Sequence, residues 1–540
     1  MENPIAFAIL VASLLGVVYI SWWGKRFTTN TTDFYVAGGK ISARLNGWAM
    51  FGDYCSAASF LGIAGAIAIT GVDSWWVAIG FFGAWVFVLI ALAGPLKSSG
   101  KFTVADVLVG RFGGRSLKFL AMAATVVIGT LYLVPQIVGA GHLFQLLLGW
   151  DYMVTVVVSA VVMGLMVVLG GMMGTTYNQA IQGVILLAAM LVLFVMAAVV
   201  YFGGNPFAII TTAMNTVPPS EAVKVVEQVA LPPLAEGATQ HGPGVLAEAI
   251  RQGFANLPNA LTPGVAVPDV WSQVSLVLGL LLGVAGLPHI LIRFYTVKDA
   301  LDAKKGAQLT IIWLAVFYIA VLFVGFATMT ILYDELIAML AAGDAGRATN
   351  MAIPLLGMEL GGEVVLGLVA AGAMAAMLST AVGLLISMTT SLSHDVYAGV
   401  LRPNSTDRER LVFAKSGAVV LTVIALAASV WLKDQNVAVL VSMCFGIAAS
   451  TFAPILILSV WWKGLTKEGV IAGFIVGLTV ALTFTFARFA GVPEMLGIRV
   501  LGNPALYGVP SALLAIVSTS LLTRNVGNAR EFLAMAHRDA

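Results

Sequence analysis

The sequence predicts an all-α protein that crosses a membrane many times, and three observations support this fold class. Of the 540 residues, 60% are hydrophobic and only 10% are charged, whereas about 25% of a soluble domain is charged. The mean hydropathy is +0.97. Thirteen apolar runs are long enough to span, since a membrane helix needs about 20 residues. None has the alternating pattern of a membrane β-strand, so a soluble, disordered or β-barrel protein is excluded.

The thirteen apolar runs define the expected helices in chain order. The first run lacks the basic segment that precedes the apolar part of a secretory signal, so we expect it to span. Cys55 and Cys444 both lie in apolar runs, which argues against a disulfide framework or a CxxC metal motif. The expected helices cover 5–23, 45–70, 74–96, 117–148, 152–170, 177–202, 271–292, 307–333, 363–392, 411–432, 436–461, 468–490 and 505–523.

The Lys and Arg residues predict the orientation. If the N-terminus lies outside, 22 of the 28 basic residues fall in cytoplasmic connections or the C-terminal tail, and six fall outside. Positive charge gathers in cytoplasmic loops, so we expect an N-terminus outside and a C-terminus inside, in a bacterial inner membrane. The net charge of +2 gives no reason to expect a nucleic-acid partner. Segment 203–270, rich in Pro and Gly, is then an extracellular loop, either a plain linker or a cap over an entry path.

The second expected helix combines helix-breaking glycine with polar groups. Gly52, Asp53, Ser56 and Ser59 follow one another within two turns. Asp53 is an ionisable group inside a span, and such groups are costly unless partnered and are often functional. It is therefore either a proton-carrying or coupling carboxylate, or a carboxylate that bonds a neighbouring helix or a loop arginine.

The seventh expected helix is interrupted as well. Pro288 removes a helical hydrogen bond, and His289 follows it, either as a packing residue or as a ligand. Each interrupted helix opens a block of five helices, and an odd block size gives the two blocks opposite orientations, as an inverted repeat requires. Paired broken helices mark the central site of a transporter. We therefore divide the chain into 1–44 (an extra helix and first cytoplasmic loop), 45–202 and 271–461 (the two repeats), 203–270 (the extracellular loop) and 462–540 (two peripheral helices and a tail).

The ninth expected helix offers oxygen ligands for a small cation. Ser379 and Thr380 place hydroxyls about 100° apart around the helix, and the Ala376 carbonyl lies a turn below. A hard cation binds several such oxygens. However, Ser and Thr in membrane helices commonly bond back to their own helix, and from the residues alone this second interpretation is favoured.

Several motifs together resemble the sodium:solute symporter family. They are Tyr-Val-Ala-Gly-Gly at 35–39, Ser-Ala-Ala-Ser-Phe-Leu-Gly at 56–62, Gly-Gly-Met-Met-Gly-Thr-Thr-Tyr at 170–177, and Leu-Ser-Thr at 378–380 followed by Ser-His-Asp-Val-Tyr at 393–397. Within the family, the segments from Gly52 and from Ala285 are similar to the cation/acetate permease branch. The resemblance runs from about residue 30 to 465.

The resemblance implies a leucine-transporter-type fold, with a 5+5 inverted repeat, one helix before it and two after. It also implies a sodium site formed by the backbone oxygens of Gly52 and Cys55, the Ala376 carbonyl, and the hydroxyls of Ser379 and Thr380. Relatives with a second sodium site carry an aspartate where this chain has Gln179. We therefore expect one sodium ion per cycle and no organic cofactor.

The same resemblance, with the polar residues of the broken helices, predicts a small substrate site. Its residues are Ser56, Ser59, Tyr132, Gln136, Pro288 and His289, with no buried Lys or Arg expected beside them. Hydroxyls, an amide and half-helix dipoles can hold a carboxylate, so we expect sodium-coupled uptake of acetate, propionate, glycolate or pyruvate.

Alternatives to this function remain at the level of sequence. They are sodium- or proton-coupled transport of proline, another amino acid or urea, with Asp53 or His289 as a proton carrier, and a membrane sensor. A membrane enzyme is not expected, because there is no HExxH motif and no pair of intramembrane aspartates. The family resemblance also allows a small two-helix membrane companion.

Overall fold

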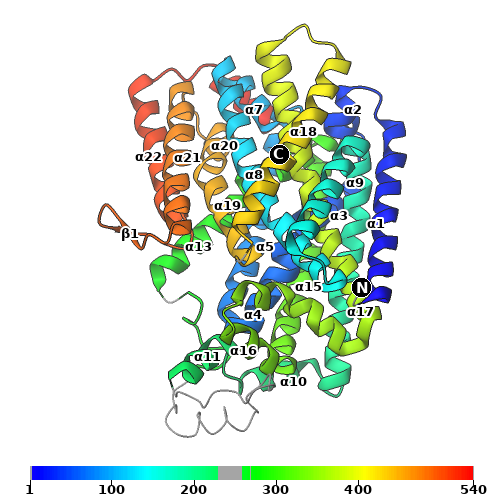
Figure 1. Cartoon of the computed structure of the whole chain (residues 1–540). Coiled ribbons are helices and arrows are strands. Elements are labelled where there is room, and N and C mark those ends of the chain that lie inside the picture. The colour runs from blue at the N-terminus through cyan, green and yellow to red at the C-terminus, as the bar shows by residue number, and fades with distance from the viewer. Residues whose placement is uncertain (1–2, 229–257, 268, 434, 539–540) are drawn as a thin grey trace.

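The computed structural model describes residues 3–228, 258–267, 269–433 and 435–538. Long helices run side by side along one direction, while α10, α11 and α16 gather at one end and α2 and α7 at the other (Figure 1). A short hairpin, β1 with β2, connects α21 to α22. The elements are α1 (Pro4–Gly24), α2 (Thr31–Val36), α3 (Ala43–Tyr54), α4 (Ile63–Thr70), α5 (Trp75–Ala91), α6 (Ala93–Ser99), α7 (Val104–Phe112), α8 (Arg115–Leu148), α9 (Tyr152–Tyr201), α10 (Pro206–Ala213), α11 (Pro219–Gln228), α13 (Val270–Gly283), α14 (Pro288–Leu291), α15 (Ala300–Ile331), α16 (Tyr333–Ala341), α17 (Ala345–Thr390), α18 (Asp407–Trp431), α19 (Val437–Ser450), α20 (Phe452–Trp461), α21 (Lys467–Phe489), β1 (Glu494–Met495), β2 (Ile498–Arg499), α22 (Ala505–Thr523) and α23 (Ala529–Ala536).

Ten helices in the described ranges are long and apolar enough to cross a membrane, or eleven if the bent pair Val270–Gly286 and Pro288–Thr296 is one span. The expected count of thirteen is therefore not confirmed. Part of the difference lies at Gly171, whose φ of +57 kinks the 50-residue α9 between the two expected helices 152–170 and 177–202. Glycine adopts positive φ without steric cost, and apolar runs do not reveal whether such a glycine ends a helix.

Both expected interruptions are present. The second expected helix stops at Tyr54, where α3 ends, and resumes through a π-helical turn, Ala58–Gly62, that leads into α4. The seventh is interrupted at Leu287, which has extended backbone, and Pro288 begins the short α14. The two parts meet at 43°. These breaks leave backbone carbonyls and amides without helical partners in the interior of the bundle.

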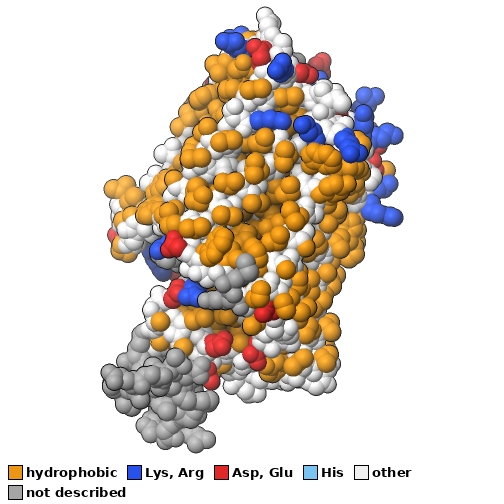
Figure 2. Space-filling view, turned by 45° about the vertical axis from the view of Figure 1, so that its right-hand side comes forward, with side chains coloured by type: hydrophobic (Ala, Val, Ile, Leu, Met, Phe, Trp, Pro, Cys, Tyr) orange, Lys and Arg blue, Asp and Glu red, His pale blue; other side chains and the backbone are white. Residues whose placement is uncertain are grey.

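The core lies around α17, whose most apolar stretch is completely buried. It packs against α9, α8 and α3, which brings the broken end of α3 against Ser379 and Thr380. Figure 2 shows hydrophobic side chains covering the flank of the molecule and Lys and Arg gathered toward one end. An apolar belt between polar ends is the surface that a bilayer requires.

The expected loop 203–270 is described in part, and residues 229–257 lie outside the described residues. Its C-terminal part is fixed to the start of α5. The Val72 amide donates to the Ala260 carbonyl at 2.8 Å, and the Asp73 carboxylate accepts from the Gly264 and Ala266 amides at 2.8 and 3.0 Å. This part of the loop therefore packs on the ends of α4 and α5.

Candidate cation and substrate site

The broken end of α3 meets two hydroxyl groups of α17. Because α3 ends at Tyr54, the carbonyls of Gly52 and Asp53 lie in its last turn, which lacks helical amide partners. They accept hydrogen bonds from the Ser379 and Thr380 hydroxyls, each at 2.6 Å. The Ser379 hydroxyl also lies 2.9 Å from the Ala376 carbonyl. The structure thus brings together four of the five residues expected at a cation site.

Cys55, the fifth expected residue, follows directly at the end of α3 in extended backbone, with φ −71 and ψ 93. Its thiol is buried, as is that of Cys444. The oxygens of this cluster are neutral carbonyls and hydroxyls, which are hard ligands suited to a small hard cation. The carbonyls at the end of α3 also carry the negative end of its helix dipole.

Gln179 of α9 borders the same cluster. Its amide donates to the Ser379 carbonyl at 2.8 Å. The helices approach closely here, because a Cβ added to Gly52 would lie 2.0 Å from the Gln179 carbonyl oxygen. Gln179, which takes the place of the aspartate expected at a second sodium site, thus bonds the backbone of the cation cluster.

The Asp53 side chain forms a buried ion pair with a neighbouring helix, which is one of the two alternatives that the sequence left open, although the sequence did not identify the partner. The Nε atom of Arg293 donates to the Asp53 carboxylate at 3.2 Å, and both side chains have no exposed surface. Arg293 Nη1 donates to the Thr176 hydroxyl at 2.8 Å. The expectation that no buried base lies beside the substrate site is therefore wrong, and Arg293 is not a residue of a cytoplasmic loop. The sequence signal that could have identified Arg293 as a buried base is its position four residues after His289 on a broken helix.

The expected substrate residues lie between the two broken helices. The Tyr132 ring packs edge-on against His289 with centroids 5.4 Å apart, and the Tyr132 hydroxyl bonds Ser56. Gln136 accepts from the Ala57 amide at 3.0 Å and donates to the Tyr132 carbonyl at 3.3 Å. Four residues therefore form one buried polar group, and Pro288 lies next to it in the chain.

Ser59 points to a different partner. Its hydroxyl lies 3.0 Å from the Tyr318 hydroxyl of α15. Ser59 is buried and belongs to the π-helical turn rather than to the end of α3. This contact therefore does not join Ser59 to Tyr132 or His289.

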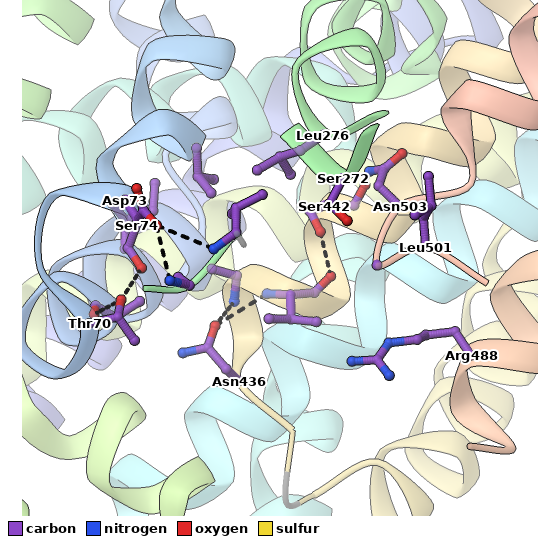
Figure 3. A pocket seen from close by; sticks show the side chains of 18 of the residues that line it. Thr70, Asp73, Ser74, Ser272, Leu276, Asn436, Ser442, Arg488, Leu501 and Asn503 are labelled. Atoms are coloured by element: carbon purple, nitrogen blue, oxygen red, sulfur yellow. Dashed lines mark hydrogen bonds between the residues drawn. The ribbon is translucent and has the colours of Figure 1, made fainter. Parts of the chain in front are cut away.

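An aromatic cluster lies between this polar group and an outer cavity. The Phe445 ring lies 5.7 Å from Tyr132 and 4.7 Å from Phe81, measured between centroids. Three residues before Phe445 on α19, Ser442 lines a cavity of about 500 Å³. Figure 3 shows this cavity between Thr70 and Asp73 on one side and Arg488 and Asn503 on the other.

A second polar cluster lies at the opposite end of the bundle. The Asp106 carboxylate of α7 accepts from His394 at 3.0 Å and from the Phe102 and Thr103 amides at 2.9 and 3.2 Å. Burial alone acts to raise the pKa of Asp106, but these bonds lower it below its usual value. They therefore stabilise the fold above the usual carboxyl pKa, and this stability is lost as the pH falls through the lowered one.

Gly383 provides the space for the Asp53 carboxylate. A Cβ added to Gly383 would lie 2.1 Å from Asp53 Oδ1. We expect Gly383→Ala to displace the carboxylate from Arg293 and to destabilise the protein by about 1–3 kcal/mol. Thermal unfolding in nanodiscs measures this, with Gly417→Ala as the control, because a Cβ there meets its neighbours at 3.4 Å or more. Equal melting temperatures for the two variants would contradict the close packing.

Comparison with known proteins gives a consistent match. The profile of the sodium:solute symporter family matches residues 34–477. The chain is 35% identical over 524 residues to the uncharacterized symporter YwcA of Bacillus subtilis (strain 168), covering 95% of this chain and 93% of that protein.

Two solved structures show the same fold. A Na⁺-coupled sialic acid symporter in a substrate-bound, outward-open state has a TM-score of 0.70 at 18% identity, with 96% of this chain and 98% of that chain covered. Mhp1, a nucleobase-cation-symport-1 family transporter, has a TM-score of 0.51 at 12% identity, with 93% and 98% covered. At these identities the likeness concerns the fold alone, which is of the leucine-transporter type.

Proposed function

The chain belongs to the sodium:solute symporter family, so it is a sodium-coupled transporter and not an enzyme, and we propose that its solute is a small monocarboxylate. Acetate, propionate, glycolate and pyruvate are the members of this class that we consider. In this proposal one sodium ion and one carboxylate are taken up together. The two repeats, 45–202 and 271–461, then move relative to one another to expose the site alternately on the two sides.

The cluster at Ser379 and Thr380 is the observation that supports the proposed coupling to sodium. Their hydroxyls lie 2.6 Å from the carbonyls at the broken end of α3. A sodium ion bound among these oxygens links α3 to α17 and orders the break beside the substrate residues. The Gln179 amide in place of an acid supports a single sodium ion, and uptake with one monovalent anion is then electroneutral.

The size of the polar group supports a small solute. Ser56, Tyr132, Gln136 and His289 form a small polar group at the break, beside the Asp53–Arg293 pair, and all four are buried. Aromatic rings and small residues surround them. A sugar presents many hydroxyls and needs more polar partners than these. Two to four carbons with one carboxylate match this set.

The distribution of charge supports the proposed orientation. Lys and Arg gather at the end of the bundle that holds α2 and α7 (Figures 1 and 2). We assign this end to the cytoplasm because positive charge is retained there. The start of α1 lies toward the other end (Figure 1), and the outer cavity with Arg488 and Arg499 then faces the outside.

A substrate-competition panel in sodium-loaded proteoliposomes tests the proposed solute. We expect unlabelled propionate, glycolate or pyruvate to compete with labelled acetate, while proline and urea do not. Protein-free liposomes are the control. If labelled acetate is not taken up and labelled proline or urea is taken up instead, the transporter belongs to another solute of the family.

A further inference from the structure

Arg293 is a completely buried base directly beside the substrate residues. It follows His289 by four residues in the helical stretch Pro288–Thr296, with His289 in α14 and Arg293 in the 3₁₀ turn that continues it. A guanidinium is the planar donor that fits a carboxylate with two parallel bonds. Arg293, close to His289 in the chain, therefore supplies a side chain that can recognise a carboxylate by both charge and shape.

Asp53 contacts both Arg293 and the cation cluster. Its carboxylate accepts from Arg293 Nε at 3.2 Å, while its backbone carbonyl accepts from the Thr380 hydroxyl at 2.6 Å. Its Oδ1 atom packs on Gly383, one turn along α17 from Ser379 and Thr380. The same residue therefore lies within a helical turn of the sodium ligands and within hydrogen-bond distance of the guanidinium.

Several polar atoms along this line have no hydrogen-bond partner among the described residues. They are Arg293 Nη2 and both ring nitrogens of His289. Both side chains are at least 99% buried. Buried polar atoms are almost always hydrogen-bonded, and an unpaired one costs about 1–3 kcal/mol. Their concentration at one place indicates that polar ligands bind there.

We propose that Arg293 binds the carboxylate of the substrate, which replaces Asp53 as its partner, and that the released Asp53 carboxylate turns to the sodium ion at Ser379 and Thr380. This inference rests on the proposed function and names the residue that recognises the substrate class. Four charges then form two new pairs. The substrate pairs with Arg293, and sodium pairs with Asp53.

The exchange explains why the two cargo ions must bind together. Without cargo, Asp53 and Arg293 cancel one another, and the site is neutral. With both ions bound it is neutral again. Either ion alone leaves one net charge in the low-dielectric interior, which costs several kcal/mol. The empty and the fully loaded sites are therefore favoured over the half-loaded ones, which is the condition for tight coupling.

Binding of labelled acetate to the full-length protein in nanodiscs, with and without sodium, tests the exchange. Asp53→Asn leaves Arg293 without its acid, so we expect acetate binding that no longer depends on sodium. In Arg293→Gln we expect the acetate affinity to fall by about 30-fold or more, because a buried charge partner of the carboxylate is lost. The neutral pair Asp53→Asn with Arg293→Gln removes both charges, folds without an unpaired ion, and should show the same loss of acetate affinity.

The control is Arg111→Lys, since Arg111 is also a buried arginine but donates to backbone carbonyls of the region following α20. It should keep the sodium dependence of acetate binding. If the wild type binds acetate with sodium and the Asp53→Asn protein shows the same sodium dependence, the exchange is wrong while the proposed function stands. If the wild type binds no monocarboxylate, the proposed function itself fails. Acetate affinity retained in the neutral double variant would also overturn the role of Arg293.

Discussion

Ser379→Ala combined with Thr380→Ala should reduce sodium-driven uptake to the level of empty liposomes. Each hydroxyl lies 2.6 Å from a carbonyl at the break of α3, and each is a ligand of the proposed sodium ion. Hydrogen bonds and ligands to charged groups are worth about 1.5–3 kcal/mol each. Losing two should therefore weaken sodium binding by about 100-fold or more. The readout is the sodium concentration that gives half-maximal uptake of labelled acetate.

The control for this pair is Thr389→Ala on the same helix. The Thr389 hydroxyl is also buried but donates only to Leu385 and Ile386 carbonyls of α17 itself. We expect this variant to keep the sodium dependence of the wild type. Sodium-driven uptake that survives in the Ser379 and Thr380 double variant would show that the cation binds elsewhere.

Arg111→Met should produce the largest loss of stability. The guanidinium is buried and donates to the Trp462 carbonyl at 2.8 Å, the Lys463 carbonyl at 3.2 Å and the Leu458 carbonyl at 3.3 Å, and also to Ser459. These carbonyls lie in the last turn of α20 or just beyond it, where helical amide donors become scarce; the Leu458 and Trp462 carbonyls also accept backbone amides, whereas those of Ser459 and Lys463 accept from Arg111. Removing the guanidinium leaves the Ser459 and Lys463 carbonyls without this donor, which should cost about 3 kcal/mol.

Thermal unfolding in nanodiscs measures this loss, and Arg115→Met is the matched control. Arg115 begins α8 and is exposed, so its replacement should leave the melting temperature close to that of the wild type. If both variants unfold at the same temperature, the Arg111 bonds do not hold the end of α20 in place.

The interrupted helices were predictable because their cause is local. Pro288 lacks an amide donor, and the second helix carries polar residues in an apolar run, so both breaks follow from residues that are neighbours in the chain. Ser379 and Thr380 were identified only with the family resemblance. By themselves, hydroxyls of this kind are expected to bond to their own helix, and the contact that distinguishes them comes from Gly52 and Asp53.

The arginine partner of Asp53 was missed because the two residues are distant in the chain. Asp53 and Arg293 are 240 positions apart, and a basic residue near the end of an apolar run reads as a loop residue under the positive-inside rule. The carbonyl partners of Arg111 near residue 460 are likewise far from it in the chain. The helix count differs in part at Gly171, where a positive φ kinks α9 between two expected helices. The Asp53–Arg293 pair and the Arg111 bonds depend on packing between distant segments rather than on local composition.

Uptake of labelled acetate into proteoliposomes under separately imposed gradients tests the central claim most directly. A sodium gradient, a potassium gradient and a pH gradient are compared at zero membrane potential, with protein-free liposomes as the control. We expect acetate accumulation above that of the protein-free liposomes only with the inward sodium gradient, and labelled sodium to enter in a one-to-one ratio with it. Protein-dependent accumulation driven by the pH gradient, or no sodium-driven accumulation of acetate, propionate, glycolate or pyruvate, would contradict sodium–monocarboxylate symport.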